Sequence, residues 1–216
     1  MNNKTEVVFI LDRSGSMSGL ESDTIGGFNG ILKKQKKLEG EVLVSTVLFD
    51  DECEVLYDRE PLHSIKDMTD DEYYVRGCTA LLDAVGGAIH HIGTIHKYAR
   101  EEDRPDKTIF VIITDGMENA SEHYTSEKVK AMIERQQSRF GWEFIFLGAN
   151  MDAVKEARKY GIRESRVAEY IADERGTKLS YEAVDNCIRS VRCDFYMDEL
   201  CIDPVREDTK KRRKRI

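Results

Sequence analysis

The sequence predicts an α/β domain built on a mostly parallel, doubly wound β-sheet with helices on both faces. Four short, almost continuously apolar runs rich in β-branched residues indicate strands buried on both faces, at residues 7–11, 42–49, 109–114 and 143–147. Amphipathic helical patterns fill the gaps between these runs. Strands that alternate with helices form βαβ units, which produce a parallel sheet.

Two further segments complete the predicted sheet. Asp50 and Asp51 are turn-forming residues directly after the second strand, so residues 52–57 are expected to fold back on that strand. Residues 166–171 carry a weaker strand pattern. We therefore expect one antiparallel strand at an edge of the sheet.

Five helices are expected around the sheet. The first two are indicated by apolar side chains at helical spacing, which are Ile25, Phe28, Ile31, Leu32 and Leu38 in one helix and Leu81, Val85, Ala88, Ile92 and Ile95 in the other. The remaining helices are expected near residues 129–140, 150–161 and 179–191.

Composition restricts the class of protein. The chain has 216 residues, of which 40% are hydrophobic, and this is enough for one domain with a substantial core. Its net charge is −8, although residues 210–215 are all basic, so the rest of the chain is more acidic still. This pattern is not typical of a dedicated nucleic-acid-binding protein, whose basic groups spread over a folded face.

The cysteines and the apolar runs indicate a soluble, cytoplasmic protein. The five cysteines have irregular spacing and form no CxxC pair, which argues against a disulfide framework and against a zinc site. We expect reduced thiols, with a Cys193–Cys201 bond as the less favoured alternative. No run approaches the roughly 18 apolar residues of a membrane span.

Three loops carry side chains that could bind a metal through oxygen. Asp12, Ser14 and Ser16 form a D-x-S-x-S pattern directly after the first strand, and Asp115 directly follows the strand at 109–114. Thr79 lies in a loop that opens the second long helix. Ligands bind at the carboxyl ends of the strands in doubly wound sheets. The two loops that follow strands are therefore expected to lie side by side if their strands are neighbours.

Two carboxylates and three hydroxyls suit a hard divalent cation. Mg²⁺ takes octahedral oxygen ligands and readily keeps water molecules, and Mn²⁺ accepts the same ligand types. The sequence has no cluster of His or Cys, which disfavours zinc and copper. Because only some of these groups can bind the ion directly, at least one coordination position should stay open for an incoming carboxylate.

These loops carry a resemblance to a known family. The segments DRSGS (12–16), GCTAL (77–81) and ITDG (113–116) resemble the metal-ion-dependent adhesion site (MIDAS) of von Willebrand factor A (VWA) domains in order, spacing and strand context. The resemblance implies a Rossmann-like sheet wrapped by helices with a short antiparallel edge strand. It also implies a set of metal ligands, namely Asp12, Ser14, Ser16, Thr79 and Asp115.

The resemblance further implies a binding function. Members of this family mostly bind proteins, and an Asp or Glu of the partner completes the coordination of the metal. Intracellular members often serve in multiprotein assemblies, some of them with AAA-type ATPases. We therefore expect a monomeric, metal-dependent protein-binding module without catalytic activity.

The resemblance covers roughly residues 4–172, and this sets the expected domain organisation. We expect a VWA domain over residues 1–172 and a helical C-terminal extension packed on it over residues 173–202. Residues 203–216 lose periodicity and become almost wholly charged after Pro204, so we expect a flexible basic tail there.

Three residues beside the metal loops are candidate partner contacts, Met17, Glu118 and Asn119. Glu118 and Asn119 could equally be loop residues without that role, and Met17 could pack on the first helix.

The sequence leaves two alternative functions open. One is a metal-dependent hydrolase, although the sequence has no G-x-S-x-G elbow, no P-loop and no G-x-G-x-x-G motif. The other is association with nucleic acid through the basic tail, which would add salt-sensitive, nonspecific affinity.

Overall fold

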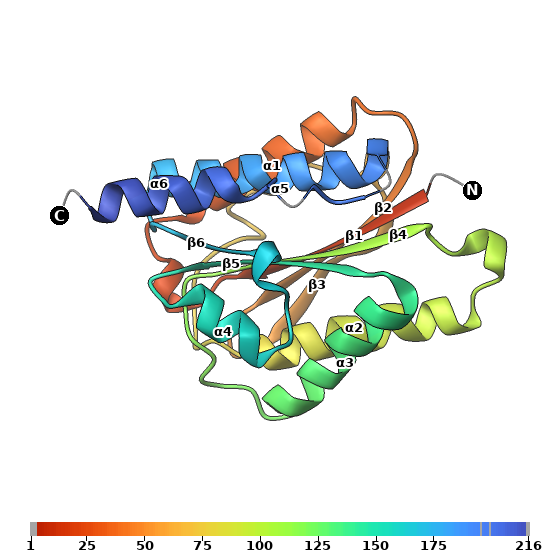
Figure 1. Ribbon diagram of the computed structural model, residues 1–216, viewed down its shortest axis with the longest axis horizontal. Coiled ribbons are helices and arrows are strands. Elements are labelled where there is room, and N and C mark those ends of the chain that lie inside the picture. The colour runs from red at the N-terminus through yellow and green to blue at the C-terminus, as the bar shows by residue number, and fades with distance from the viewer. Residues whose placement is uncertain (1–3, 195, 199, 215–216) are drawn as a thin grey trace.

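The sheet at the centre of the fold has the strand order β3-β2-β1-β4-β5-β6. Its strands are β1 (Lys4–Asp12), β2 (Glu41–Phe49), β3 (Cys53–Pro61), β4 (Lys107–Thr114), β5 (Glu143–Ala149) and β6 (Val167–Tyr170). The structure is a computed structural model that describes residues 4–194, 196–198 and 200–214 (Figure 1). Neighbouring strands are parallel except β3, which runs antiparallel to β2 at one edge. The predicted fold class is confirmed.

Helices cover both faces of the sheet (Figure 1). One face carries α1 (Glu21–Gln35), α5 (Glu174–Asp194) and α6 (Asp203–Arg213), and the other carries α2 (Leu81–Tyr98), α3 (Ser126–Phe140) and α4 (Ala153–Lys159). Short 3₁₀ helices occupy Gly15–Met17, Leu62–Ser64, Glu101–Asp103 and Glu164–Arg166. Within the described part of the chain, no helix has the length and apolar character needed to cross a membrane.

The strands are continuously apolar because the sheet packs against two separate cores. In β1, Val7 and Phe9 face the core beneath α1 and α5, whereas Val8 and Ile10 face the core beneath α2 and α3. Successive side chains of a strand point to opposite faces. A strand covered on both sides therefore needs an apolar residue at every position rather than at every second one.

The strand order reverses beside β1, and this fixes the position of the site. The chain runs from β1 to β2 and β3 on one side, and then crosses to β4 on the other side of β1. Leu11 pairs with Leu48 of β2 and with Ile113 of β4. The carboxyl ends of β1 and β4 therefore meet at the switch point, which is where open α/β sheets bind ligands.

The prediction of a flexible tail over residues 203–216 is wrong for residues 203–213, which form helix α6. Pro204 occupies the first turn, where its missing N–H breaks no helical hydrogen bond. Val205 and Thr209 are buried against the domain. This helix was not predicted because most positions on its inner face are polar, so the sequence shows no apolar stripe at helical spacing. The last two residues of the chain lie outside the described residues.

Helix α6 covers the edge of the sheet at β6. Arg206 Nε donates to the carbonyl oxygen of Val167 at 2.9 Å, and Thr209 Oγ1 donates to the carbonyl oxygen of Glu169 at 2.7 Å. An uncovered edge strand would present such backbone acceptors to solvent or to another chain. The side chains of α6 therefore satisfy part of the hydrogen-bonding capacity of this edge.

Helix α5, which makes up most of the expected C-terminal extension, contributes to the core. Val184 and Ile188 of α5 belong to the same buried cluster as Phe28 and Ile31 of α1. Helices α1 and α5 therefore cover the sheet together.

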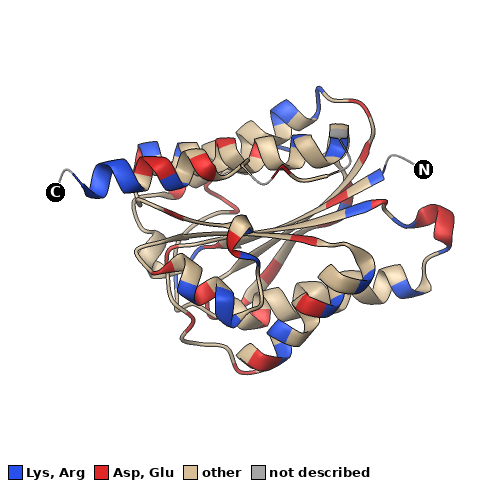
Figure 2. Cartoon of the chain, in the orientation of Figure 1, with Lys and Arg blue, Asp and Glu red and all other residues tan. Residues whose placement is uncertain are grey.

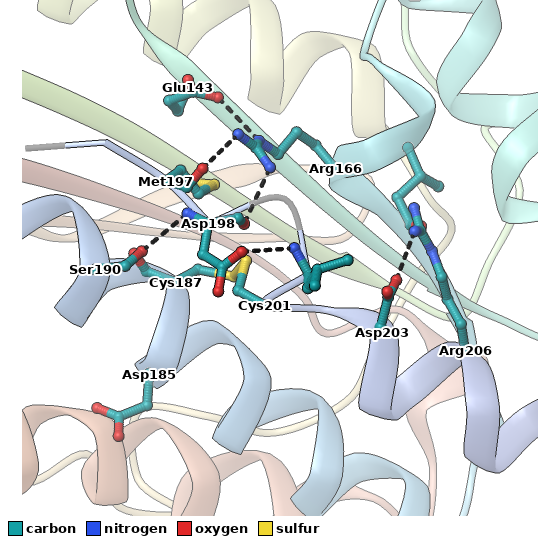
Figure 3. The surroundings of a disulfide bond; sticks show 12 residues. Glu143, Arg166, Asp185, Cys187, Ser190, Met197, Asp198, Cys201, Asp203 and Arg206 are labelled. Carbon is teal, nitrogen blue, oxygen red and sulfur yellow. Dashed lines mark hydrogen bonds and ion pairs between the residues drawn. A yellow bond between two sulfur atoms is a disulfide. The ribbon is translucent and has the colours of Figure 1, made fainter. Parts of the chain in front are cut away.

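A disulfide joins Cys187 in α5 to Cys201 in the segment before α6 (Figure 3). The expectation of five reduced thiols is therefore wrong. The alternative Cys193–Cys201 pair is also wrong, because Cys193 is free and exposed. Cys187 lies on the buried face of α5, and the returning chain brings Cys201 onto that face. This encounter depends on tertiary packing, which cysteine spacing does not reveal.

Arg166 holds the same segment from the sheet side (Figure 3). Its guanidinium donates to the carbonyl oxygens of Met197 at 3.0 Å and Asp198 at 3.2 Å, and to the carboxylate of Glu143 at 3.1 Å. The segment before α6 is therefore anchored on two sides.

Breaking the Cys187–Cys201 bond is expected to lower the free energy of unfolding by about 2–3 kcal/mol, because the bond closes a short loop in the unfolded chain. The two cysteines are 14 positions apart in the sequence. Denaturant unfolding of the wild type and of a Cys187→Ser, Cys201→Ser double variant, each with and without reductant, measures this. Only the wild type should respond to reductant, and equal stability of the oxidised wild type and the double variant would contradict the prediction.

The amino-terminal edge of the sheet holds a buried aromatic residue and a buried carboxylate. Trp142 is buried and its ring stacks on Phe110 with the ring centroids 5.2 Å apart. Glu6 is fully buried, and its carboxylate accepts a hydrogen bond from Arg59 Nε at 2.5 Å and contacts His96 Nε2 at 2.5 Å. These groups lie at the opposite end of the strands from the switch point.

Candidate metal centre

Backbone hydrogen bonds bring the three predicted metal loops together at the carboxyl ends of β1 and β4. Gly15 N donates to the carbonyl oxygen of Gly77 at 3.2 Å, which brings the loop before α2 against the loop after β1. Asn119 N donates to the carbonyl oxygen of Thr79 at 3.0 Å, which brings the loop after β4 against the same segment.

The five predicted ligand side chains converge in this arrangement. Ser14 Oγ lies 3.1 Å from Ser16 Oγ and 3.1 Å from Thr79 Oγ1. Ser16 Oγ donates a hydrogen bond to Asp115 Oδ1 at 2.5 Å. Asp12 Oδ1 accepts a hydrogen bond from Ser14 N at 2.7 Å. One connected network therefore contains all five residues.

Two buried carboxylates give this network its electrostatic character. Asp12 is fully buried, and burial raises its pKa to about 6, although hydrogen bonds from Ser14 and Thr114 favour the ionised form. The nearby carboxylate of Asp115 raises the pKa of Asp12 further. Burial likewise raises the pKa of Asp115. A cation bound between these groups would offset the free-energy cost of burying their charges.

Thr114 is a contributor that the sequence reasoning missed. It is fully buried, and its Oγ1 donates to Asp12 Oδ2 at 2.5 Å. The same hydroxyl lies 3.1 Å from the carbonyl oxygen of Gly116. Thr114 therefore fixes the orientation of the Asp12 carboxylate from the neighbouring strand.

The geometry fits a divalent cation on two counts. Asp115 Oδ2 is buried and has no hydrogen-bond partner, so this acceptor lacks a donor or a cation. A Cβ atom placed on Gly116 would lie 2.7 Å from Thr79 Oγ1 and 3.1 Å from Ser16 Oγ. It would lie 3.6 Å from Ser14 Oγ, so three hydroxyl oxygens surround one small space. Carboxylate and hydroxyl oxygens are suitable ligands for Mg²⁺ or Mn²⁺.

Hydroxyl oxygens are an essential part of this donor set. Among the described residues, no group of three or more His, Cys, Asp or Glu side chains is placed to hold a metal. Any cation at the switch point would therefore rely on serine and threonine together with the two aspartates.

Met17, a predicted partner contact, is only 1% exposed. That prediction is wrong in this structure, because Met17 points inward from the 3₁₀ turn after β1 and lies among the buried side chains. Met117 occupies the exposed position instead. It is 64% exposed and follows Asp115 and Gly116 directly. The sequence signal for it is weak, since it consists of one apolar residue in a polar loop.

The side chains of Glu118 and Asn119 accept hydrogen bonds from backbone N–H groups of this protein. Glu118 Oε2 accepts a hydrogen bond from Leu82 N at 2.8 Å, at the start of α2, and its Oε1 accepts one from Ser121 N at 2.8 Å. Asn119 Oδ1 accepts one from Thr79 N at 2.9 Å. Both residues therefore hold the loops in place, and a direct contact with a partner stays a prediction.

Comparisons with known proteins identify similar solved structures and thereby the fold family. No protein-family model and no curated protein matches the sequence. Several solved structures do match, among them proximal thread matrix protein 1 from the mussel byssus, with 17% identity and a TM-score of 0.60 over 84% of this chain and 45% of that chain. A second structure of the mussel protein, described with a zinc-occupied MIDAS motif, shows 16% identity and a TM-score of 0.58 over 84% and 44%.

A von Willebrand factor type A protein from Catenulispora acidiphila matches with 15% identity and a TM-score of 0.57, over 84% of this chain and 42% of that chain. The present chain thus spans less than half the length of these three structures. Likeness at this level of identity concerns the fold alone. Together with the sheet topology, it shows that this chain has the fold of a von Willebrand factor A domain.

Proposed function

We propose that this protein is a metal-dependent protein-binding module. Asp12, Ser14, Ser16, Thr79 and Asp115 would hold Mg²⁺ or Mn²⁺, either directly or through water. The observation that carries the proposal is the unpartnered, buried Asp115 Oδ2 beside three converging hydroxyl oxygens. The mussel protein with zinc at its MIDAS supports a divalent cation at this place in the fold.

The outward side of the site suits an incoming acidic side chain. When bound, the cation supplies a positive centre that can accept a carboxylate from a partner. Ser16 is exposed, so the network opens to solvent on this side. Met117 is exposed beside Asp115 and offers an apolar contact next to the charge. We therefore propose a protein partner that presents an Asp or Glu next to an apolar side chain.

The alternative of nucleic-acid binding through the basic C-terminal run loses support in the structure. The cations gather at the end of α6 (Figure 2). Several of them are neutralised there: Arg212 pairs with Asp173, Arg213 with Glu169, and Lys211 with Glu207. Paired cations release fewer counterions on binding a phosphate backbone, so they contribute less affinity. Hydrolysis forms no part of the proposal.

The cellular setting stays a prediction. An assembly with an AAA-type ATPase is implied only by the resemblance. The Cys187–Cys201 disulfide argues against the expected cytoplasmic location, because stable disulfides are typical of oxidising compartments.

Gly116→Ala is expected to abolish metal-dependent binding although it replaces none of the proposed ligand residues. The added methyl group would occupy the space between Thr79 Oγ1 and Ser16 Oγ. Gly26→Ala is the matched control, because a Cβ atom there meets no atom within 4 Å. The first measurement is the shift in melting temperature on adding Mg²⁺ or Mn²⁺ instead of EDTA, which should appear in the wild type and in Gly26→Ala only.

The same three proteins, immobilised and exposed to a lysate of the source organism with Mg²⁺ or EDTA, test partner binding by mass spectrometry. A partner retained by the wild type and Gly26→Ala only in Mg²⁺ would support the proposal. Identical captured proteins in all conditions, together with no metal-induced shift, would overturn it.

A further inference from the structure

A cluster of buried charges lies directly beneath the metal loops. Arg13 stands between Asp12 and Ser14 in the chain, yet its side chain is fully buried. Arg13 Nε donates to Asp50 Oδ2 at 2.7 Å, and Arg13 Nη1 donates to Glu54 Oε2 at 2.7 Å. A loop arginine is usually solvated, so a fully buried one indicates a specific internal role.

Asp50 connects this arginine to the second metal loop. The same atom, Asp50 Oδ2, accepts a hydrogen bond from Arg76 Nε at 2.7 Å. The backbone oxygen of Asp50 accepts one from Ala80 N at 2.7 Å, directly after Thr79. Asp50 is itself fully buried in the turn between β2 and β3. One carboxylate therefore reaches both the loop that carries Ser14 and Ser16 and the loop that carries Thr79.

Backbone hydrogen bonds also connect the β2–β3 turn, the loop that carries Ser14 and the loop that carries Thr79. Arg13 N donates to the carbonyl oxygen of Phe49 at 2.8 Å, and Arg76 N donates to the carbonyl oxygen of Arg13 at 2.8 Å. Gly77 has a positive φ of 63°, and a Cβ atom there would overlap Asp51 Oδ1 at 1.7 Å. The β2–β3 turn therefore packs tightly against both metal loops, and the Arg13–Asp50–Arg76 cluster is its ionic centre.

We propose that Asp50 is a positioning residue of the metal centre, which sets the spacing between the Ser14 and Ser16 hydroxyls and the Thr79 hydroxyl. This inference rests on the function proposed above. Without the Asp50 charge, the buried Arg13 would keep only Glu54, whose side chain is half exposed, as an anionic partner. Arg13 Nη2 already lacks a hydrogen-bond partner. The Arg13 side chain would then have to move. Because Asp12 and Ser14 are its neighbours in the chain, that movement would shift two of the proposed metal ligands.

The opposite end of the sheet offers a matched control. Glu6 is also fully buried and also accepts a hydrogen bond from an arginine, Arg59, but it lies at the amino-terminal edge. Asp50→Asn and Glu6→Gln each remove one buried charge from an ion pair. Both variants should lose stability, because each takes an anionic partner away from a guanidinium that is fully buried in Arg13 and largely buried in Arg59. Only the first change lies next to the metal loops.

The test measures Mn²⁺ affinity directly. Purified full-length wild type, Asp50→Asn and Glu6→Gln are titrated with Mn²⁺ alone, and free Mn²⁺ is followed by electron paramagnetic resonance. The temperature is one at which circular dichroism shows every variant folded. Asp50→Asn should weaken Mn²⁺ binding by about 10-fold or more, as loss of a group that orients metal ligands commonly does. Glu6→Gln should stay within about 2-fold of the wild type, since distant sites act independently.

A second variant covers the case in which Asp50→Asn does not fold. Arg76→Ala removes the other guanidinium at Asp50, and its side chain is 41% exposed, so the fold should tolerate the change. It should weaken Mn²⁺ binding in the same direction. Glu52→Gln, which changes the exposed second partner of Arg76, should not.

The outcomes separate the two proposals. If the wild type itself binds no Mn²⁺, the proposed function fails and this inference fails with it. If the wild type binds Mn²⁺ and both Asp50→Asn and Arg76→Ala bind equally well, the function stands and the positioning role of Asp50 is overturned. Equal weakening by Asp50→Asn and Glu6→Gln would also overturn it, because the effect would then be general destabilisation.

Discussion

Asp12→Asn is expected to abolish binding of Mg²⁺ and Mn²⁺ while leaving the metal-free protein at least as stable as the wild type. Asp12 is fully buried, and burial raises its pKa to about 6. A shift of this size corresponds to as much as about 3 kcal/mol of unfavourable charge burial at neutral pH. Asparagine removes this charge and keeps an oxygen to accept the hydrogen bond from Ser14 N.

The neighbouring threonine can adapt to the new side chain. Thr114 Oγ1 donates to Asp12 Oδ2 in the wild type, but the same hydroxyl lies 3.1 Å from the carbonyl oxygen of Gly116. A rotation of its O–H toward that carbonyl would let Thr114 accept a hydrogen bond from the asparagine amide. The variant therefore loses a charge while its side chain keeps a hydrogen bond with both Ser14 N and Thr114 Oγ1.

Two measurements check this prediction. Denaturant unfolding in EDTA should give Asp12→Asn a free energy of unfolding equal to or above that of the wild type. Addition of Mg²⁺ or Mn²⁺ should then raise the stability of the wild type alone. If the variant retains metal-induced stabilisation, Asp12 is not a ligand. If it unfolds in EDTA, Asp12 has a structural role that does not depend on metal.

Deletion of residues 203–216 is expected to destabilise the protein by about 3–5 kcal/mol and to promote self-association. The deletion exposes the surface on which Val205 is buried, which is worth about 1.5–3 kcal/mol. It also removes the hydrogen bonds from Arg206 to Val167 and from Thr209 to Glu169, each worth about 1 kcal/mol. The edge of β6 then has free backbone acceptors that can pair with another chain.

The control for this deletion keeps the helix and changes its charge. Lys210, Lys211 and Lys214 are exposed, and the ion pair between Lys211 and Glu207 is exposed as well, so replacing the three lysines with glutamine should leave the melting temperature almost unchanged. Thermal unfolding and size-exclusion chromatography of the deletion, the lysine variant and the wild type provide the measurement. A deletion variant that is as stable as the wild type and no more self-associated would show that α6 is not an integral part of the fold.

The sequence predicted the sheet because its physical signal is local. Successive residues such as Val8 and Phe9 face two different cores, and this requirement is visible in the sequence as an unbroken apolar run. The metal loops were also accessible, because Asp12 and Asp115 directly follow two such runs. The sequence predicted that these two loops lie close together, and the parallel pairing of β1 and β4 places them so.

Features that depend on distant packing were not accessible in this way. The burial of Arg13 requires Asp50 from another turn, and the Cys187–Cys201 bond requires the return of the chain over α5. Met17 and Met117 each follow a motif residue in a loop, yet one points into the core and the other into solvent. Local residue patterns carry no information about that difference. Helix α6 was missed for a related reason, since its buried face is mostly polar.

The location of Trp142 allows fluorescence to distinguish unfolding of the protein from binding of a metal ion. It is the only tryptophan in the chain, and it is buried against Phe110 at the amino-terminal edge of the sheet. Its fluorescence therefore reports separation of the helices from that edge during unfolding. The metal loops lie at the other end of the strands, so ion binding confined to those loops should leave the emission unchanged. A change in tryptophan emission during a metal titration of the folded protein would thus reveal that binding is transmitted along the length of the strands.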